Sequence, residues 1–372
     1  MSKIKITTLT PIHIGSGSFL QYNTEFITTE KKISKERFVR VIDDRKILAL
    51  VGEEHVNDWL LSIERMEDIK AFVKRYAPES KVTDYSDRCM PLFADDVKGT
   101  DTLKECIHDG FGVPYIPGSS IKGAIRTAVL ASIVDPKVVQ SKVVNKYGRI
   151  SASEVEKFLF GKDPNADVFR FLHVGDAYFD KGSEIAIRLI MGLNVTQRDS
   201  LIPKNDTKPQ LVEAIAFDEE AYCQLKVATE YYSMVKRTMP DAIGDMPQQM
   251  TSVQVLFELV NEHTLKLVEE EIALWEEYKN KIGADEYIEK MHDILAAVKQ
   301  CKLGECVLRI GHASGWRFIT GAWAEDLSNF DTDIVSASRP QNAKYSEYMF
   351  PKSRRLDSDG ELVGFVKLSL QS

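Results

Sequence analysis

The sequence predicts an α+β fold with antiparallel sheets. Segments with strand-like alternation are interleaved with helical segments along the chain, and neighbouring strands are joined by turns as in hairpins. Apolar residues make up 44% of the 372 residues, which is enough for a sizeable core. A chain of this length is typical of two domains or of one elaborated domain.

The first part of the chain is expected to begin with strands and to continue with helices. Residues 3–14 alternate as a strand that a proline interrupts, and a turn of glycines and serines follows. Residues 25–33 and 37–42 are predicted to form a hairpin. Residues 47–74 have helical spacing, whereas residues 77–112 are polar and mixed and are interpreted as an insertion.

The middle of the chain is predicted to combine one long helix with several strands. The helix runs from Ser119 to about Val134, where an Asp-Pro pair ends it. The long polar loop that contains Arg198 is interpreted either as a partner-binding loop or as a solvated mobile loop. Strands are predicted on both sides of this loop and before it, at residues 169–179, 184–195 and 210–217.

The last third is expected to alternate helices and strands again. The order allows two copies of a βαββαβ unit, although spacing alone does not require them. The predicted elements are a helix at residues 219–234, a strand at 252–260, helices at 263–281 and 284–302, a strand at 305–310 and a closing strand at 361–370.

Charge and cysteine content limit the function classes. The net charge of −8 argues against broad non-specific binding of nucleic acid, but it leaves room for a local basic groove. The five cysteines are scattered and form no zinc-ligand pattern, which is typical of a reducing compartment. No apolar run approaches the ~18 residues of a membrane helix, and the N-terminal strand lacks an apolar signal core. We therefore expect a cytoplasmic protein with no membrane partner and no metal or cofactor.

The segment from Val113 to Leu130 is predicted to hold an anion. Ser119 or Ser120 can cap the helix that follows the Pro-Gly bend, and the first turn of a helix offers free N–H groups and the positive end of its dipole. Lys122 and Arg126 are four residues apart and so share one helix face. The alternative interpretation is an ordinary helix start with a solvated basic face.

Two glycine-rich segments follow predicted strands. In TPIHIGSG, His13 precedes Gly15 and Gly17 and is a candidate phosphate contact or acid–base group, although a lone strand histidine is more often structural. In GHASGWRF, exposed backbone, an aromatic ring and an arginine match the requirements for binding single-stranded nucleic acid. The alternative there is a turn whose tryptophan packs on the core. The candidates in this second segment are Gly311, His312, Gly315, Trp316 and Arg317.

Other features are weaker. Arg354 and Arg355 belong to a basic run that is either a phosphate contact or a solvated loop. His173 and Asp176 are doubtful as a catalytic dyad, because residues three apart on a strand point to opposite faces. No HExxH, paired CxxC, GxSxG or GxGxxG pattern occurs, and no aspartate occurs between residues 1 and 42.

Taken together, TPIHIGSG, IPGSSIKGAIRTAVL and GHASGWRF resemble the RAMP superfamily of CRISPR-associated proteins. Their order and spacing are most similar to the subunit family that caps type III-A (Csm) effector filaments at the crRNA 3′ end. The segments HVGDA and 198–214 also fit, whereas residues 77–112 and 263–302 correspond to no motif and are treated as insertions.

The resemblance implies one or two ferredoxin-like (RRM-like) domains with helical insertions and a protruding hairpin or thumb. It implies an N-terminal domain at residues 1–165 with the insertion at 77–112, and a C-terminal domain at 166–372 with the insertion at 263–302. It also implies RNA binding through glycine loops and helix starts. The expected partners are crRNA and other Csm subunits, with target RNA and host nucleases that mature crRNA as further candidates.

The slicing subunit of such complexes carries an aspartate in the loop after its first strand, and no aspartate occurs in the corresponding region here. We therefore expect a non-catalytic RNA-binding subunit that serves crRNA maturation and antiviral defence, although the question of enzymatic activity stays open. The first alternative is a metal-independent RAMP endoribonuclease that trims crRNA with His13 or His312. A second alternative is a phosphometabolite enzyme that uses the helix start at Ser119. The predicted RNA-binding residues are His13, Gly15, Gly17, Ser119, Ser120, Lys122, Arg126, Arg198, Gly311, His312, Gly315, Trp316 and Arg317.

Overall fold

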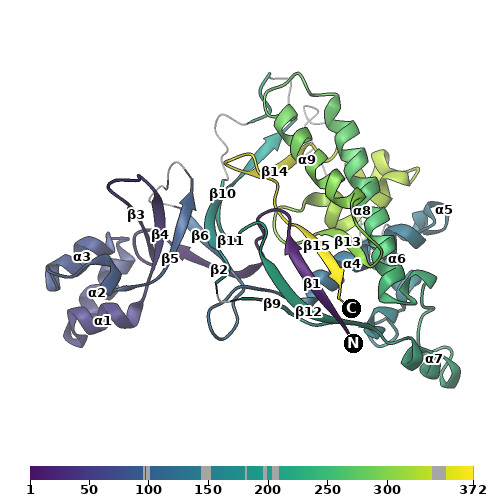
Figure 1. Cartoon of the computed structure of the whole chain (residues 1–372), viewed down its shortest axis with the longest axis horizontal. Helices are drawn as coiled ribbons and strands as arrows, with labels where there is room; N and C mark the ends of the chain where they lie inside the picture. The colour runs from purple at the N-terminus through teal and green to yellow at the C-terminus, as the bar shows by residue number, and fades with distance from the viewer. Residues whose placement is uncertain are drawn as a thin grey trace.

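The computed structural model of the chain describes residues 1–94, 97, 101–143, 152–180, 182–195, 199–202, 209–336 and 349–371. It has the predicted α+β architecture, with two sheets, a helical layer and a small helical lobe at one end of the molecule (Figure 1). No helix in the described part of the chain is long and apolar enough to cross a membrane.

The first sheet brings together strands from both ends of the sequence. β1 (Ser2–Thr8) lies between β12 (Glu220–Val227) and β15 (Phe365–Leu370) and is antiparallel to both. Among the described residues its seven strands include four more: β13 (Glu305–Arg309) beside β15, β8 (Leu172–Val174) and β9 (Ala177–Phe179) beside β12, and β7 (Tyr115–Ile116) beside β9.

Helices cover one face of this sheet. In β1 and β12 every second residue is buried, which is the alternation expected when one sheet face packs on a core and the other faces water. The core on that face joins Ile4 and Leu225 to Ile121 and Ile125 of α4 (Gly118–Ile133) and to Phe257 of α8 (Val253–Glu276). Smaller elements complete this part: α5 (Pro136–Val139), η3 (Gln140–Lys142), α6 (Ser153–Phe160), η4 (Val168–Phe171), α7 (Thr229–Thr238) and η5 (Gln248–Met250).

The second sheet lies next to the first and extends toward the helical lobe (Figure 1). An isolated antiparallel bridge between Ile12 and Ile215 connects the two sheets just before His13. The strand order of the second sheet is β2 (Gly15–Gln21), β6 (Thr102–Cys106), β11 (Gln210–Ile215), β10 (Ile185–Asn194), β5 (Ser86–Phe93), β4 (Arg37–Ile42) and β3 (Phe26–Glu30), with β14 (Ser353–Asp357) also paired to β10.

The helical lobe has a small core of its own. Ile47, Trp59 and Phe72 come from its three helices and pack against Ile27 of β3 and Ile42 of β4. The helices and their connections are α1 (Asp44–Val51), η1 (Glu53–His55), α2 (Val56–Glu64), α3 (Ile69–Tyr76) and η2 (Val82–Asp84). The predicted hairpin and the predicted helical segment at residues 47–74 are thus confirmed.

Two predicted elements are wrong in type. Residues 252–260 are not a strand but the start of α8, because Leu256, Phe257 and Val260 recur at helical spacing and are buried. Residues 219–234 are a strand, β12, followed by the helix α7, because the even-numbered residues of β12 face water and the odd-numbered ones face the core.

The helices α8 and α9 (Ala284–Lys299) form an antiparallel pair that continues the layer over the C-terminal strands (Figure 1). Gly283 lies between them as the N-cap of α9 and has a positive φ of 95°, which glycine adopts without strain. The segments η6 (Arg317–Gly321), η7 (Ala322–Asp326) and η8 (Phe330–Val335) then follow the glycine-rich turn.

The division into domains at residues 165 and 166 stays a prediction. Both sheets take strands from both of the predicted ranges, since β1 pairs with β12 and β15, and β6 pairs with β11. The predicted insertion at 77–112 contains two strands of the second sheet, β5, which pairs with β4, and β6, which pairs with β2.

Candidate nucleic-acid interface

The two glycine-rich segments from opposite ends of the sequence meet at a pair of histidines. The rings of His13 and His312 lie edge to face, with centroids 5.6 Å apart. The main-chain N–H of His312 donates a 2.9 Å hydrogen bond to the main-chain oxygen of His13. We call His13, Gly15, Gly311 and His312 the histidine junction.

Glycine is required where the two backbones touch. Gly311 has a φ of 77°, and a Cβ there would lie 2.5 Å from the main-chain oxygen of His13. A Cβ on Gly15 would lie 3.1 Å from Nε2 of His13, so this glycine leaves that nitrogen approachable. Gly17 and Gly315 also have positive φ, but a Cβ on either would meet open space. The close approach therefore depends on Gly311.

The protonation state of the two imidazoles follows from their surroundings. His13 is 2% exposed, and its Nδ1 is 2.7 Å from the main-chain oxygen of Glu213, so Nδ1 carries the proton and Nε2 is left as an acceptor. Burial lowers the pKa of His13. Burial, followed by the charges of His13, Lys104 and Arg355, lowers the pKa of His312 to about 4. Both rings are therefore neutral near pH 7, beside two cationic side chains.

Beneath the junction lies a buried ion cluster that joins strands of the second sheet. The fully buried carboxylate of Glu213 accepts a hydrogen bond from Arg88 at 2.8 Å and one from the Cys106 main-chain N–H at 2.9 Å. His108 Nε2 lies 3.0 Å from the same carboxylate. Burial opposes ionisation of Glu213, but the His108 hydrogen bond and the Arg88 charge outweigh it and lower the pKa. The cluster fixes β5, β6 and β11 under His13.

The start of α4 differs from the prediction. Pro117 is the N-cap, and neither Ser119 nor Ser120 caps the helix, so the predicted serine cap is wrong. The carboxylate of Asp176 instead accepts a 2.7 Å hydrogen bond from the Gly118 N–H. A Cβ on Gly118 would lie 2.3 Å from the main-chain oxygen of Val174, so the HVGDA segment packs directly on the helix start. An internal carboxylate thus occupies the place where an external anion was expected.

Lys122 and Arg126 line one cavity of about 800 Å³ between α4 and α6, as their spacing predicts. Arg126 is committed to ion pairs with Glu156 at 2.9 Å and Asp167 at 2.8 Å, and it also lies over the ring of Phe160. Lys122 makes no ion pair within the described residues, and burial lowers its pKa. Of the two predicted cations, Lys122 is the one free to bind a phosphate.

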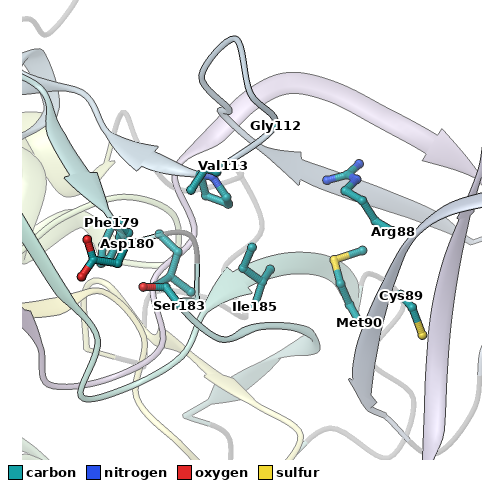
Figure 2. Close-up of a pocket in the computed structure, with 11 residues that line it drawn as sticks. Arg88, Cys89, Met90, Gly112, Val113, Phe179, Asp180, Ser183 and Ile185 are labelled. Atoms are coloured by element: carbon teal, nitrogen blue, oxygen red, sulfur yellow. The ribbon is translucent and has the colours of Figure 1, made fainter.

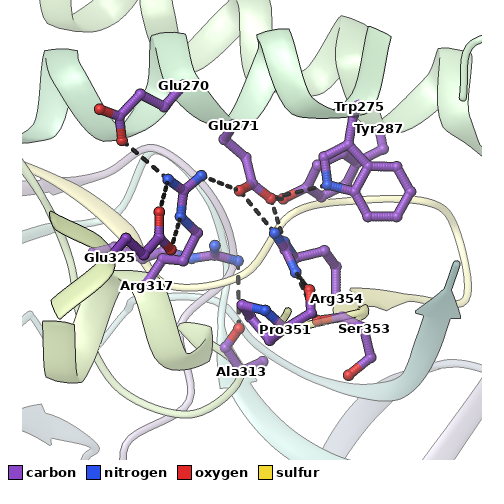
Figure 3. A network of polar contacts seen from close by, with 11 residues as sticks. Glu270, Glu271, Trp275, Tyr287, Ala313, Arg317, Glu325, Pro351, Ser353 and Arg354 are labelled. Carbon is purple, nitrogen blue, oxygen red and sulfur yellow. Dashed lines mark hydrogen bonds and ion pairs between the residues drawn. The ribbon is translucent and has the colours of Figure 1, made fainter. Parts of the chain in front are cut away.

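The end of GHASGWRF is built into the protein interior (Figure 3). Arg317 is buried and forms ion pairs with Glu270 at 3.0 Å, Glu271 at 3.3 Å and Glu325 at 2.9 Å. Arg354 donates to both oxygens of Glu271, from Nη2 to Oε2 at 2.9 Å and from Nε to Oε1, so it is neither a solvated residue nor a free phosphate contact. This cluster joins α8 to η6 and β14.

The Trp316 ring packs against Phe350, with centroids 5.3 Å apart, and against Phe330 at 5.9 Å. The alternative interpretation of a core-packed tryptophan is therefore confirmed. RNA contact at the predicted residues stays a prediction, and Arg198 lies outside the described residues.

The three motifs are adjacent through a chain of backbone hydrogen bonds. The main-chain N–H of Ile107 donates to Ile14 at 2.8 Å, and Tyr115 donates to Ile107 at 3.3 Å. These bonds place the strand that leads into α4 beside TPIHIGSG, which itself contacts GHASGWRF. Sequence spacing does not predict this arrangement, because Ile107, which connects the two segments, lies in the predicted insertion at 77–112.

A cleft that the sequence analysis missed lies next to this connection (Figure 2). It has a volume of about 300 Å³, with Arg88 and Met90 of β5 on one side and Phe179 and Asp180 on the other. Val113 lies over it in Figure 2. The cleft shares Arg88 with the ion cluster under the histidine junction.

Comparison with known proteins gives a family match and two curated relatives. The family model of the RAMP superfamily matches residues 5–318. The Csm5 protein of Streptococcus thermophilus is 28% identical over 186 residues, which cover 47% of this chain and 51% of the relative. The Csm5 protein of Enterococcus italicus is 27% identical over 154 residues, 34% of this chain and 42% of the relative. The matched region thus spans about half the length of these curated relatives.

Solved structures show the same fold over nearly the whole chain. A chain in the cryo-EM structure of a type III-A Csm–crRNA–target RNA ternary complex has a TM-score of 0.69 at 22% identity, covering 100% of both chains. The crystal structure of T. onnurineus Csm5 has a TM-score of 0.65 at 21% identity, covering 97% of this chain and 99% of that one. These likenesses bear out the expected ferredoxin-like α+β fold.

Proposed function

Because this chain belongs to the RAMP superfamily and is Csm5-like, we propose that it is a non-catalytic RNA-binding subunit of a type III-A CRISPR (Csm) effector complex. Within this proposal it caps the filament near the crRNA 3′ end, contacts crRNA and neighbouring Csm subunits, and supports crRNA maturation and antiviral defence in the cytoplasm. Contacts with target RNA and recruitment of host nucleases are further parts of the same proposal.

The observation that carries the proposal is the histidine junction. It combines closely approachable backbone at Gly15 and Gly311 with two neutral imidazoles and the nearby charges of Lys104 and Arg355. Such a combination suits the phosphate and sugar groups of RNA, whose contacts position a protein without reading sequence.

The predicted RNA-binding residues differ in whether contacts inside the protein already hold their side chains. Lys122 and the histidine junction remain, together with Gly17 of β2, Ser119 and Ser120 in the first turn of α4, and Gly315. Arg126, Trp316 and Arg317 are held by internal partners, and releasing the two arginines would leave carboxylates unpaired. The phosphometabolite alternative loses its support, because Asp176 occupies the helix start on which it depended.

Binding is favoured over cleavage by the protonation of the junction. Metal-independent cleavage needs one group that accepts a proton and one that donates it. With the pKa of His312 at about 4, that ring is neutral near pH 7 and offers no imidazolium proton for general-acid catalysis. The described residues contain no cluster of three or more histidine, cysteine, aspartate or glutamate side chains that could hold a metal ion.

The proposal is tested by expressing the tagged full chain with its neighbouring genes and sequencing the RNA that co-purifies. We expect guide RNAs together with the other effector subunits. The variant His312→Ala should recover less guide RNA, whereas the control His292→Ala, an exposed histidine on α9, should match the wild type. Recovery of the chain without RNA or partners would overturn the proposal.

One observation favours the endoribonuclease alternative, namely that two histidines lie 5.6 Å apart beside a glycine loop. A phosphate bound between them would raise both pKa values and could make one ring an acid. The test is incubation of the purified chain with end-labelled crRNA precursor in EDTA. Cleavage that disappears in His312→Gln would replace the non-catalytic proposal, and intact RNA at every pH from 5 to 8 would remove this alternative.

A further inference from the structure

The face of the first sheet that helices do not cover carries a row of tyrosines. The strand registers place Tyr222 of β12 opposite Tyr178 of β9, and Tyr178 opposite Tyr115 of β7. Lys5 of β1 is the next residue in the same line, opposite Tyr222. We call Tyr115, Tyr178 and Tyr222 the tyrosine row.

The rings of this row are ordered and accessible. Tyr178 is 51% exposed and Tyr222 is 36% exposed. The Tyr115 and Tyr178 rings are stacked, with centroids 5.5 Å apart and 22° between their planes. Lys3 Nζ lies 4.3 Å from the centre of the Tyr222 ring, and the Tyr222 hydroxyl donates to Glu220 at 3.1 Å. The row is therefore set in place before any ligand arrives.

The core does not use these rings. Ala177, Ala221 and Cys223 lie next to them in sequence and point to the helical layer, where they are buried. In β1 and β12, both of which are fully described, the residues on the open side are polar or aromatic and none is aliphatic. Aromatic rings with lysines and few aliphatic groups match a surface for stacked bases and their phosphates better than the apolar centre of a protein interface.

The charges on this face leave cations available. Lys5 and Lys367 are paired with Glu220 at 2.6 Å and Glu305 at 2.9 Å. Lys3 and Lys226 have no ion pair among the residues that the structure describes. Lys3 of β1 lies opposite Gln224 of β12, and Lys226 of β12 lies opposite His173 of β8. These two lysines therefore lie on neighbouring strands beside the tyrosine row.

Near Tyr222 lie Asp180 and Glu220, of which Glu220 is already paired with Lys5. Two further carboxylates lie toward the other end of the row. Asp176 and Asp109 are close enough to Tyr178 to contribute to the rise in its pKa. Both accept main-chain hydrogen bonds, from Gly118 and from Phe111 and Val113 respectively. A polyanion would avoid that end and follow Lys3 and Lys226.

We propose that the open face of the first sheet is a second RNA surface, on which bases of a single-stranded segment stack on Tyr178 and Tyr222 while Lys3 and Lys226 bind the phosphates. The inference rests on the proposed function, since it assigns a further part of the RNA path to the same subunit. It differs from the histidine junction in chemistry, because it offers π-faces where the junction offers backbone and imidazole groups.

The test measures binding of a short unstructured fluorescent RNA to the purified full chain by anisotropy. Stacking of a base on an aromatic ring is worth roughly 1–3 kcal/mol, so Tyr178→Ala should raise the Kd by about five-fold or more, and Tyr178→Phe should keep nearly full affinity. Tyr231→Ala is the matched control, because Tyr231 is also 51% exposed and also packs on one ring, that of Phe171, but lies on α7. Unchanged thermal unfolding would show that each variant is folded.

The outcomes separate this inference from the proposed function. Wild-type binding that Tyr178→Ala weakens, with ultraviolet crosslinks to peptides of β9 or β12, supports the second surface. Wild-type binding that neither Tyr178→Ala nor Tyr222→Ala alters, with crosslinks confined to the histidine junction, overturns it and leaves the proposed function standing. Normal RNA binding with loss of co-purifying effector subunits in Tyr178→Ala would make the face a protein interface and would also overturn it. Absence of RNA binding by the wild type would overturn both.

Discussion

The carboxylate of Asp176 accepts a 2.7 Å hydrogen bond from the Gly118 N–H at the start of α4. The sequence of that start predicts a site for an external anion, and the structure fills it with a carboxylate of the chain itself. The HVGDA segment and the Pro-Gly-Ser helix start are therefore two parts of one structural contact. Removing this contact should lower the stability of the protein.

Replacing Asp176 with alanine should destabilise the protein by about 1 kcal/mol, the usual effect of removing a side-chain acceptor from a helix N-terminus. Asp176→Asn keeps an oxygen acceptor and should recover most of that loss. Urea denaturation followed by circular dichroism measures both. Equal stability of Asp176→Ala and the wild type would show that water replaces the carboxylate without cost.

Gly311→Ala should lower stability by roughly 1–3 kcal/mol or more, because its φ of 77° is strained for alanine and its Cβ would lie 2.5 Å from the His13 oxygen. The same substitution should weaken RNA binding, since it separates the two halves of the histidine junction. Gly123→Ala on α4 is the control. It is exposed, has nothing within 4 Å of the added carbon and should stabilise the helix by up to about 1 kcal/mol. Similar effects of the two substitutions would contradict the close approach at Gly311.

Removal of the Glu271 charge should be among the most damaging single changes. Burial opposes its ionisation, but the charges of Arg354 and Arg317 with hydrogen bonds from Arg354 and Tyr287 lower its pKa to about 2. Glu271→Gln removes the carboxylate paired with the buried Arg354 and one of the three carboxylates paired with Arg317. Breaking a buried ion pair typically costs about 3–5 kcal/mol. Chemical denaturation at pH 7 measures this loss, and a loss below about 1 kcal/mol would contradict the role of the cluster.

The carboxylate of Glu271 should also make the stability of the protein depend on pH. Because the pKa of Glu271 in the folded state is below its unfolded value near 4.5, its contribution to stability is complete above pH 4.5 and is lost as the pH falls toward 2. The difference in unfolding free energy between wild type and Glu271→Gln should therefore shrink over that interval. A constant difference from pH 5 to pH 2.5 would contradict the assignment.

Local periodicity predicted well those elements that local contacts determine. The hairpin of β3 and β4 and the buried face of α4, including Ile121 and Ile125, follow directly from their spacing. The spacing of residues 252–260 fits a strand as well as a helix, because Val253, Val255 and Phe257 alternate. Only the burial of Leu256 and Val260 identifies the helix.

The site was less predictable, because its partners are far apart in sequence. The glycine-rich segments could be picked out individually, but nothing in their spacing shows that the His312 N–H bonds the His13 oxygen. Likewise Arg317 and Arg354 look like free cations until the fold places Glu271 between them, 46 residues before one and 83 before the other. The tyrosine row depends on the register between three strands from separate parts of the chain.

Lowering the pH should also reveal the buried state of His312. Burial holds its pKa at about 4, below the value of 6.5 that an unfolded chain would have. The unfolded state therefore takes up a proton first, and stability should fall as the pH drops from 6.5 to 4. Since the ring is partly exposed, the slope is less than about 1 kcal/mol per pH unit. His312→Gln should show a flatter profile, and an identical profile would mean that the ring is solvated.

Lys122 and Arg126 should separate binding from stability, although they line the same cavity. Lys122→Ala removes a cation that has no ion pair within the described part of the chain, so it should weaken RNA binding and reduce the slope of log K against log salt by about 0.7 for one lost phosphate contact. Its unfolding free energy should stay within about 0.5 kcal/mol of the wild type. Arg126→Ala removes ion pairs to Glu156 and Asp167, so it should lose about 1–2 kcal/mol of stability with little change in the salt slope. Anisotropy titrations at several salt concentrations, paired with urea denaturation, measure both quantities. If Arg126→Ala changed the salt slope more than Lys122→Ala while keeping full stability, the internal ion pairs would be shown to open for RNA, and the assignment of the two cations would have to be exchanged.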